Sequence, residues 1–411
     1  MVSKMISSKF QVTSFRGYLI SFFLTSLIFS LFYMSAFFKT FNNVTTLWSS
    51  KPLVIPEPSY PVRFAYLISA SKGDVVKLKR TVLALYHPGN YYLIHMDSEA
   101  SEEEHSEIAE FVPSYDVFEQ MENVWVVDKP NLVTYRGPTM LSATLHAMSI
   151  LLRKASEWDW FINLSASDYP LVTQDDLILA FSDLPRDLNF VQHSSNLGWK
   201  VNKRANPVMI DPGLYSLNKS EIMWADKQRP VPTAFKLYTG SAWTVLSRSF
   251  AEYCIVGWEN LPRTLLMYYT NFVSSPEGYF QTVICNSEEY RNTTVNHDLH
   301  YIAWDYPPKQ HPRLLGFRDY RKMILSHRPF ARKFKQDHGV LDRIDRDLLS
   351  RQNGEFTTGG WCYKRDNSTE SCSGLQREKF GLLRPGTGAR RLRSLLRKTL
   401  YTDDFETRQC K

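Results

Sequence analysis

Residues 63–97 read RFAYLISASKGDVVKLKRTVLALYHPGNYYLIHMD, and their hydrophobic pattern changes twice along the way. The run from Arg63 to Ser71 is short, apolar and rich in strand-forming side chains. From Asp74 to Tyr86 the apolar residues recur every three or four positions, which predicts a helix. The run from Tyr91 to Asp97 returns to a strand pattern. The stretch therefore predicts a strand–helix–strand unit with parallel strands.

The same alternation continues downstream. An acidic stretch from Ser101 begins another helix, and VWVVD at Val124–Asp128 predicts a strand. A long helix is expected from about Thr139 to Ser156, followed by the strand WFINL at Trp160–Leu164. This order is typical of an α/β fold, in which helices cover both faces of a mainly parallel sheet.

In such sheets ligands bind beyond the carboxyl ends of the strands. This rule places Asp97, Asp128 and the segment Ser165–Pro170 on the rim of the predicted binding site. We find no internal repeat, no glycine-rich phosphate loop and no zinc-type cysteine spacing in the sequence.

The N-terminal region predicts a membrane anchor. Residues 1–16 carry three basic and no acidic side chains, and residues 17–38 carry no charge. A helix of that length spans the roughly 30 Å hydrocarbon core, and the basic flank favours a cytoplasmic N-terminus. A cleaved signal peptide is the alternative, but its apolar region is usually shorter and ends in small residues. We therefore expect a cytoplasmic tail (1–16), a signal-anchor (17–38) and a proline-rich stem (39–61) before a luminal domain.

The rest of the chain is long enough for one large core, with a catalytic domain expected at 62–350 and a C-terminal extension at 351–411. The net charge of +7 is modest. Much of the basic excess lies in a cluster of five side chains: Arg390, Arg391, Arg393, Arg397 and Lys398. In a luminal protein such a cluster indicates a solvated helix face rather than a nucleic-acid site.

Cysteines and glycosylation sequons fit the secretory route. The five cysteines are Cys254, Cys285, Cys362, Cys372 and Cys410. At least one of them is free or pairs with another chain, and we expect Cys362 to pair with its near neighbour Cys372. We expect N-glycosylation at Asn43, Asn218, Asn292 and Asn367. A fifth sequon, at Asn163, lies inside a predicted strand and is not expected to be modified.

Six ordered blocks of sequence carry a resemblance to a known family. They are YYLIHMD (91–97), WFINLSASDYPL (160–171), GSAWTVLSRSF (240–250), SPEGYFQTVICN (275–286), HDLHYIAWD (297–305) and PFARKF (329–334). The chain resembles glycosyltransferase family 14, which includes core-2 branching enzymes, peptide O-xylosyltransferases and plant β-glucuronosyltransferases. The resemblance implies a GT-A-like nucleotide-sugar fold and an inverting mechanism without a metal cofactor.

Inverting transfer needs a base for the acceptor hydroxyl and positive charge for the departing diphosphate. Many nucleotide-sugar enzymes supply that charge with a metal held by an Asp-x-Asp motif. Here only Asp97-Ser-Glu99 and Asp345-Arg-Asp347 approach this motif, and neither lies in a persuasive context. Lysine and arginine side chains can stabilise the diphosphate instead.

The resemblance also assigns site residues. By position in SPEGYFQTV, Glu277 corresponds to the family's catalytic base, although Pro276 replaces the acidic residue that precedes it in some relatives. Lys333 in PFARKF resembles the diphosphate-binding lysine, with Arg313 as the candidate partner. Asp97 resembles the aspartate that contacts uracil. For each of these residues the alternative is a surface charge or a strand end without a role.

Two further positions follow from the same blocks. Asp168 in SASDYP either orients hydroxyls of the donor sugar or holds a turn, and both interpretations stay open. Trp304 in YIAWD resembles an acceptor-contacting aromatic, although a core tryptophan is the commoner case.

Within the family the chain is most similar to the plant arabinogalactan β-glucuronosyltransferases. The resemblance implies transfer of glucuronate from UDP-glucuronate to β-galactan chains of arabinogalactan proteins, in the Golgi membrane. A glucuronate-selective site needs a cation for the sugar carboxylate. Arg136 in LVTYRGP is the candidate, and Lys200, Lys203 and Arg204 are alternatives that could serve the acceptor.

Two other functions remain as alternatives. A UDP-xylose or UDP-N-acetylglucosamine transferase of the same family would keep Glu277 and Lys333 without the extra cation. A non-catalytic, membrane-bound glycan-binding protein would keep the fold and the aromatics but show no turnover. Association with other Golgi transferases or with a second copy of the chain is a further expectation.

Overall fold

The computed structural model describes residues 26–31, 33–34, 60–215, 221–307, 309, 311–336, 339–362 and 379–410. The chain divides into two units, Met1–Glu57 and Pro58–Lys411. Most of the predicted tail, anchor and stem lies outside the described residues, as do the sequons at Asn43, Asn218 and Asn367. Among the described residues, no helix has the length and hydropathy needed to cross a bilayer.

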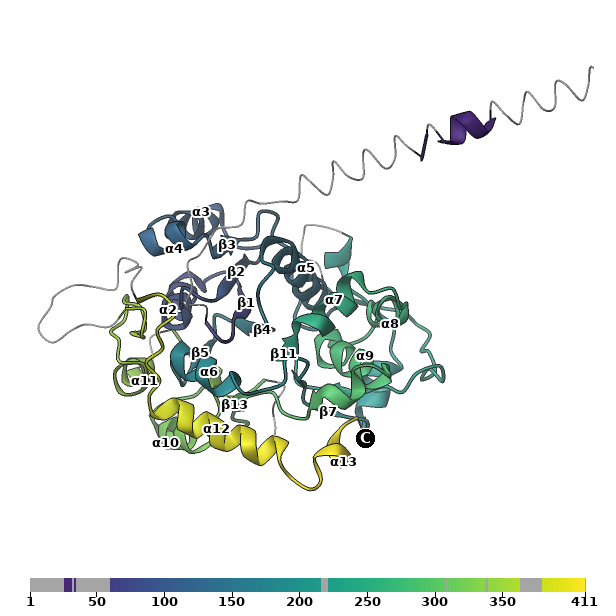
Figure 1. Ribbon diagram of the computed structural model, residues 1–411. Coiled ribbons are helices and arrows are strands. Elements are labelled where there is room, and N and C mark those ends of the chain that lie inside the picture. Colours follow the sequence, from purple (N-terminus) through teal and green to yellow (C-terminus); the bar gives the residue numbers. More distant parts are fainter. Residues whose placement is uncertain are drawn as a thin grey trace, which may run out of the picture. The chain divides into compact units, whose positions relative to one another are not determined.

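A seven-stranded sheet forms the centre of the second unit (Figure 1). Its strands are β1 (Phe64–Ala70), β2 (Tyr91–Met96), β3 (Val124–Val126), β4 (Trp160–Ser165), β6 (Asn189–Phe190), β11 (Val245–Ser247) and β12 (Thr294–Val295). The spatial order is β12-β6-β11-β4-β1-β2-β3. Strands β4, β1, β2 and β3 are parallel neighbours, and β12 is parallel to β6, whereas β11 is antiparallel to both β4 and β6. The expectation of a mainly parallel α/β sheet is confirmed, and β11 is its antiparallel strand.

Helices pack on both faces of this sheet because the strands are apolar on both sides. The helices around it are α2 (Val75–Leu85), α3 (Glu102–Phe111), α4 (Asp116–Met121), α5 (Thr139–Lys154), α6 (Gln174–Phe181), α7 (Arg248–Val256), α8 (Leu261–Tyr269), α9 (Tyr279–Asn286) and α12 (Thr387–Leu400). In β1, Phe64, Tyr66 and Ile68 join the core under α2, α3, α4, α6 and α12. The alternate residues Ala65 and Leu67 join the core under α5, α7, α8 and α9.

The predicted elements agree closely with the observed ones. The expected helix at 74–86 is α2 at 75–85, and the expected helix at 139–156 is α5 at 139–154. The helix expected from Ser101 is α3, and its start is explained by a capping box between Ser101 and Glu104. Periodicity therefore located the αβ elements that surround the site.

A second, three-stranded sheet brings distant sequence blocks together. It consists of β5 (Asp168–Pro170), β14 (Phe330–Arg332) and β13 (His300–Ile302), in the order β13-β14-β5. Strand β14 is antiparallel to β5, and the register places Arg332 opposite Asp168. Tyr169 and Ala331 from these strands pack in a third core cluster with α10 (Tyr320–Leu325) and α11 (Gly339–Ile344). Two short antiparallel pairs complete the described sheets: β7 (His193–Ser194) with β10 (Thr239–Gly240), and β8 (Met209–Ile210) with β9 (Met223–Trp224).

The described residues beyond position 350 belong to the same unit as the seven-stranded sheet. Helix α12 packs on α6 and contributes Leu392 and Leu396 to the core. After the short helix α13 (Phe405–Arg408), Cys410 forms a disulfide with Cys285 of α9. Cys254 is buried and free. Cys362 is disulfide-bonded, whereas Cys372 lies outside the described residues, so their pairing stays a prediction.

Removing the Cys285–Cys410 disulfide is expected to lower the free energy of unfolding by about 2–5 kcal/mol. The bond closes a loop of 125 residues and so restricts the unfolded chain strongly. Denaturant unfolding of a Cys285→Ser/Cys410→Ser variant would measure the loss, with Cys254→Ala as the control that leaves the bond intact. An unchanged unfolding midpoint for the double variant would contradict the expectation.

Candidate active site

Two adjoining cavities open on the second unit. The inner cavity, of about 350 Å³, is lined by residues at the carboxyl ends of β1, β2 and β4. The outer cavity, of about 1150 Å³, is lined by Glu277 and by residues around β7 and β10. Tyr135, Trp243, Pro312 and Arg332 line both cavities and so form a shared wall. The two cavities are therefore adjacent.

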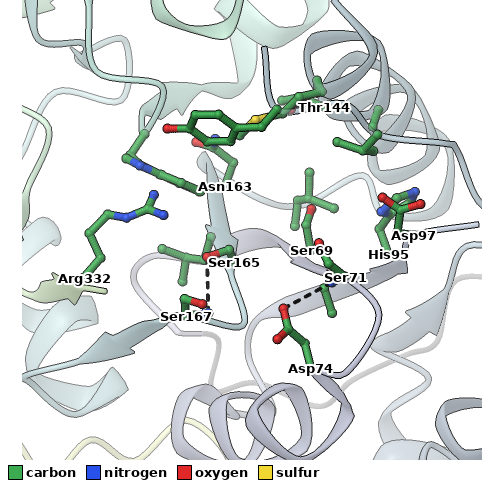
Figure 2. A pocket seen from close by; sticks show the side chains of 18 of the residues that line it. Ser69, Ser71, Asp74, His95, Asp97, Thr144, Asn163, Ser165, Ser167 and Arg332 are labelled. Carbon is green, nitrogen blue, oxygen red and sulfur yellow. Dashed lines mark hydrogen bonds between the residues drawn. The ribbon is translucent and has the colours of Figure 1, made fainter. Parts of the chain in front are cut away.

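The inner cavity lies where the rule for parallel sheets expects a ligand. Ser71, Asp97 and Ser165 end or follow the strands β1, β2 and β4, and each of them lines the cavity (Figure 2). Asp97 is buried, and its backbone N–H donates to the Ala70 carbonyl at 2.9 Å. Asp128, which the same rule placed on the rim, is exposed and does not line either cavity.

His95 stands beside Asp97 at one end of the inner cavity (Figure 2). Its Nε2 accepts a hydrogen bond from the Asn131 backbone N–H at 3.0 Å, and His146 contacts the Asn131 side chain at 3.0 Å. Burial, reinforced by the nearby His146, lowers the pKa of His95 to about 4. The imidazole is therefore neutral near pH 7 and acts as a hydrogen-bonding group.

The depressed pKa of His95 predicts a loss of stability in acid. Between pH 6.5 and about 4 the unfolded chain binds a proton at this position that the folded protein does not, so stability falls as the pH falls. Across the whole window this proton would lower the free energy of unfolding by about 3 kcal/mol. We expect the free energy of unfolding of a His95→Gln variant to depend less on pH across this window, by about that amount. Equal pH dependence for the variant and the wild type would contradict the assignment.

Arg332 is the cation at the shared wall. Its side chain is buried, and the guanidinium lies over the Trp243 ring at 3.7 Å from the centroid. Its Nε lies 3.3 Å from Oδ1 of Asp168. Among the described residues, neither Nε nor Nη1 has a hydrogen-bond partner. Figure 2 shows Arg332 on the side of the inner cavity opposite His95 and Asp97. A buried guanidinium with open donors is suited to bind an anionic ligand.

Asp168 holds this arginine and its own turn. The Asp168 carboxylate accepts from the Ser165 backbone N–H at 2.6 Å and from the Ser165 hydroxyl at 2.8 Å. Its other oxygen faces Arg332, which the register of β14 and β5 places opposite. These hydrogen bonds support the interpretation that Asp168 holds a turn. The same carboxylate also positions the Arg332 guanidinium.

Lys333, the residue that follows Arg332 and β14, also lines the inner cavity. Its side chain is half-buried, and within the described part of the chain no carboxylate forms an ion pair with it. It also lines a third, open cavity with Arg313 and Arg318. The ammonium is therefore available to a ligand in the inner cavity.

Arg313 does not join Lys333 in the inner cavity. Its guanidinium forms a two-pronged ion pair with the buried carboxylate of Asp319, with one contact at 2.8 Å. This pairing lowers the pKa of Asp319. Arg313 lines the third cavity instead. The side chain is held by Asp319, and Arg332 is the arginine beside Lys333 that lines the inner cavity.

Glu277 lies at the end of a short 3₁₀ turn, Ser275–Glu277, directly before α9. Its carboxylate accepts from Nη1 of Arg204 at 2.5 Å, and both side chains are mostly buried. Because Glu277 lines the outer cavity and Lys333 the inner one, the two residues face spaces that share a wall. The roles of Glu277 as the base and of Lys333 at the diphosphate stay predictions.

Arg136 is placed differently from the prediction. Its side chain is exposed and does not line the inner or the outer cavity. Its carbonyl accepts from the Ser274 N–H at 2.7 Å. The neighbouring Tyr135 occupies the shared wall instead. Recognition of a sugar carboxylate by Arg136 has no geometric support here.

Aromatic and basic side chains line the outer cavity. Trp304 is 52% exposed and lines it, so this tryptophan is not a core residue. Lys200 and Arg204 line it as well, whereas Lys203 is exposed outside it. Lys200 donates to the Thr239 hydroxyl at 3.1 Å, and burial together with the nearby Arg204 lowers the pKa of Lys200.

The second acidic motif has a structural role. Asp345 is buried and binds Nη2 of Arg80 at 2.7 Å and Nη1 of Arg351 at 2.9 Å. Tyr169 donates a further hydrogen bond to it at 2.6 Å. Its carboxylate is therefore saturated by partners and is a poor metal ligand.

The two described sequons differ in accessibility. Asn292 is exposed in a short 3₁₀ turn, whereas Asn163 is buried in β4. The Asn163 amide donates to the Ala242 carbonyl and accepts from Thr244, so a glycan cannot be attached there in the folded protein.

Sequence reasoning missed Arg332 and Trp243 as site residues. Arg332 is adjacent to Lys333 in PFARKF, and Trp243 lies in the block GSAWTVLSRSF, so both were inside quoted motifs. Arg332 belongs to β14, and Trp243 lies between β10 and β11. The stacking of the guanidinium on the indole therefore arises only in the folded chain.

Comparison with known proteins places the chain among its relatives. A family model described as Core-2/I-Branching enzyme matches residues 64–324. The chain is 57% identical to Arabidopsis thaliana beta-glucuronosyltransferase GlcAT14A, over 88% of this chain and 80% of the relative. It is 50% identical to GlcAT14C of the same plant, over 85% of each protein. Human xylosyltransferase 2 is 31% identical over 72% of this chain and 35% of the relative.

Among solved structures, the apo form of mouse xyloside xylosyltransferase 1 matches with 11% identity and a TM-score of 0.28, over 57% of this chain and 84% of that one. The family model spans more than half of the chain, and the plant relatives align with most of it. The chain therefore belongs to the core-2/I-branching enzyme family, glycosyltransferase family 14.

Proposed function

We propose that the protein transfers glucuronate, with inversion, from UDP-glucuronate to β-galactan chains of arabinogalactan proteins. The observation that carries this proposal is the shared wall between a cavity with Asp97, Arg332 and Lys333 and a cavity with Glu277 and Trp304. The plant relatives at 50–57% identity are named beta-glucuronosyltransferases, which supports the sugar.

The inner cavity would hold the nucleotide. Asp97 and His95 offer polar groups to the uracil end, while Arg332 and Lys333 face the diphosphate. The sugar would then lie at the shared wall, beside Tyr135. Of the cations described, Arg332 alone lines both cavities, so its open donors are within reach of a charged group on either side.

Glycosyl transfer would take place where the two cavities meet. The Glu277 carboxylate takes the proton from an acceptor hydroxyl in the outer cavity, and that oxygen forms a bond to the anomeric carbon. The bond between the anomeric carbon and the β-phosphate oxygen breaks, and its electron pair leaves with UDP. Positive charge on Lys333 and Arg332 stabilises the departing diphosphate. Attack from the face opposite UDP gives a β-glucuronosyl linkage.

Arg204 would set the orientation of the base. Its guanidinium binds one oxygen of Glu277, which leaves the other oxygen for the acceptor. Trp304 would stack on a sugar ring in the outer cavity, because pyranose C–H faces pack on aromatic surfaces.

We also propose that transfer needs no metal ion and takes place in the Golgi lumen, with the chain anchored by residues 17–38. Two cations at the inner cavity support the first proposal, and the uncharged N-terminal segment supports the second. Partnership with other Golgi transferases stays a prediction.

A donor screen tests the function. Microsomes containing the full chain would be incubated in EDTA with β-galactan and, separately, UDP-glucuronate, UDP-xylose, UDP-N-acetylglucosamine and UDP-galactose. Product with UDP-glucuronate alone is the expected result. Product with a different donor would replace the proposed sugar, and activity that requires added metal would overturn the role of the two cations. Microsomes without the chain provide the background.

A further inference from the structure

Trp199 is a second exposed tryptophan in the outer cavity. Its side chain is 66% exposed, yet it lines the same cavity as Glu277 and Trp304. Tryptophan side chains are highly buried on average, and a large exposed indole surface in a concave site is a platform for a ligand. The roles proposed for Glu277, Arg204 and Trp304 do not explain why the Trp199 indole is exposed in this cavity.

The indole lies near the guanidinium that binds the proposed base. Gly198 has φ +50, in the left-handed region, and the Lys200 N–H donates to the Leu197 carbonyl at 2.9 Å. The Arg204 guanidinium lies over the Trp199 ring at 5.8 Å from its centroid. That same guanidinium binds Glu277 at 2.5 Å. One side chain therefore links the tryptophan to the carboxylate.

The surroundings of Trp199 are those of a sugar subsite. Three exposed polar side chains, Gln192, Ser194 and Asn196, line the cavity on the same segment of chain. Hydroxyl groups of a pyranose can bond to such side chains while its C–H face packs on the indole. The cavity volume of about 1150 Å³ also exceeds that of most small-ligand sites, so it has room for more than one sugar unit.

We propose that Trp199 forms an acceptor subsite for a neighbouring sugar unit of the glycan chain, one that does not itself react. The ligand class is an uncharged pyranose within an oligosaccharide, such as a galactose unit. This inference rests on the proposed transfer to a galactan and adds a chain-length preference to it. The protein then selects acceptors of several units over a single sugar.

Kinetics against acceptor length test the subsite. With the full chain and UDP-glucuronate, kcat/KM is measured for β-galactose oligomers from the disaccharide upwards. Trp199→Ala is expected to lower kcat/KM for the longer oligomers about ten-fold, with little change for the shortest acceptor. Most of the loss should appear in KM. An equal loss at every length would overturn the proposal, because it would mean that Trp199 acts only by holding Arg204.

Two matched variants keep the test specific. Trp199→Phe retains an aromatic face and should recover most of the length dependence. Trp258→Ala removes a fully exposed tryptophan that does not line the outer cavity, so it should change nothing. Unchanged kinetics for Trp199→Ala as well would also overturn the proposal.

A binding assay separates this inference from the proposed function. Migration of the detergent-solubilised full chain through a native gel containing β-galactan requires no donor and no turnover. Retardation that is weakened by Trp199→Ala but not by Trp258→Ala supports the subsite. If the wild type binds in this way but transfers no glucuronate, the proposed function fails while the subsite stands. Equal retardation of all three proteins would reject the subsite.

Discussion

Replacement of Glu277 by Gln is expected to lower the rate of glycosyl transfer by about a thousand-fold while UDP still binds. The amide cannot take a proton from the acceptor, but its oxygen can still accept the hydrogen bond from Arg204. The fold around the 3₁₀ turn should therefore persist. Product formation from labelled UDP-glucuronate and calorimetric binding of UDP would give the two quantities.

The matched control for this variant is Glu288→Gln. Glu288 is exposed just beyond α9 and lines neither cavity, so the same chemical change there should leave the rate unaltered. A Glu277→Gln protein that keeps more than about a tenth of the wild-type rate would show that another group removes the proton. Loss of UDP binding in the same variant would point to misfolding or to a nucleotide-binding role.

Replacement of Arg332 by Ala is expected to reduce both activity and stability. Loss of a cation that faces the leaving diphosphate should lower kcat by about a hundred-fold or more. The variant also leaves the carboxylate of Asp168 buried without its charge partner, which costs about 3–5 kcal/mol of folding free energy. Transfer assays and denaturant unfolding would measure the two losses separately.

A double variant distinguishes the catalytic contribution of Arg332 from its structural one. Asp168→Asn in the Arg332→Ala background removes the stranded charge, so part of the lost stability should return. Activity should not return, because the cation is still missing. Recovery of transfer in the double variant would mean that Arg332 serves only to neutralise Asp168.

The αβ framework followed from sequence because its signals are local. Each strand from β1 to β4 is a short apolar run, and each intervening helix repeats its apolar residues at helical spacing. The expected position of Asp97 also followed, because a residue after a parallel strand must lie at the carboxyl edge of the sheet. The antiparallel insertion of β11 could not be foreseen in this way, since pairing partners far apart in sequence leave no periodic trace.

The allocation of charge within the site depended on the tertiary structure. The sequence interpretation gave Lys333 as the diphosphate-binding lysine and Arg313 as its candidate partner. In the structure Asp319 binds Arg313, and of the two only Lys333 lines the inner cavity. Arg332 could be recognised as a site residue only from the pairing of β14 with β5, which places it opposite Asp168.

The sequence by itself determined the order of strands and helices, the family and the short blocks that hold the site, because these depend on neighbours along the chain. Folding decided which of the charges in those blocks faces a ligand. The partners that fix each charge come from distant segments. Asp319 binds Arg313 through two contacts and holds it outside the inner cavity. Asp168 and Arg204 each bind one side of Arg332 and Glu277, which still line the two cavities.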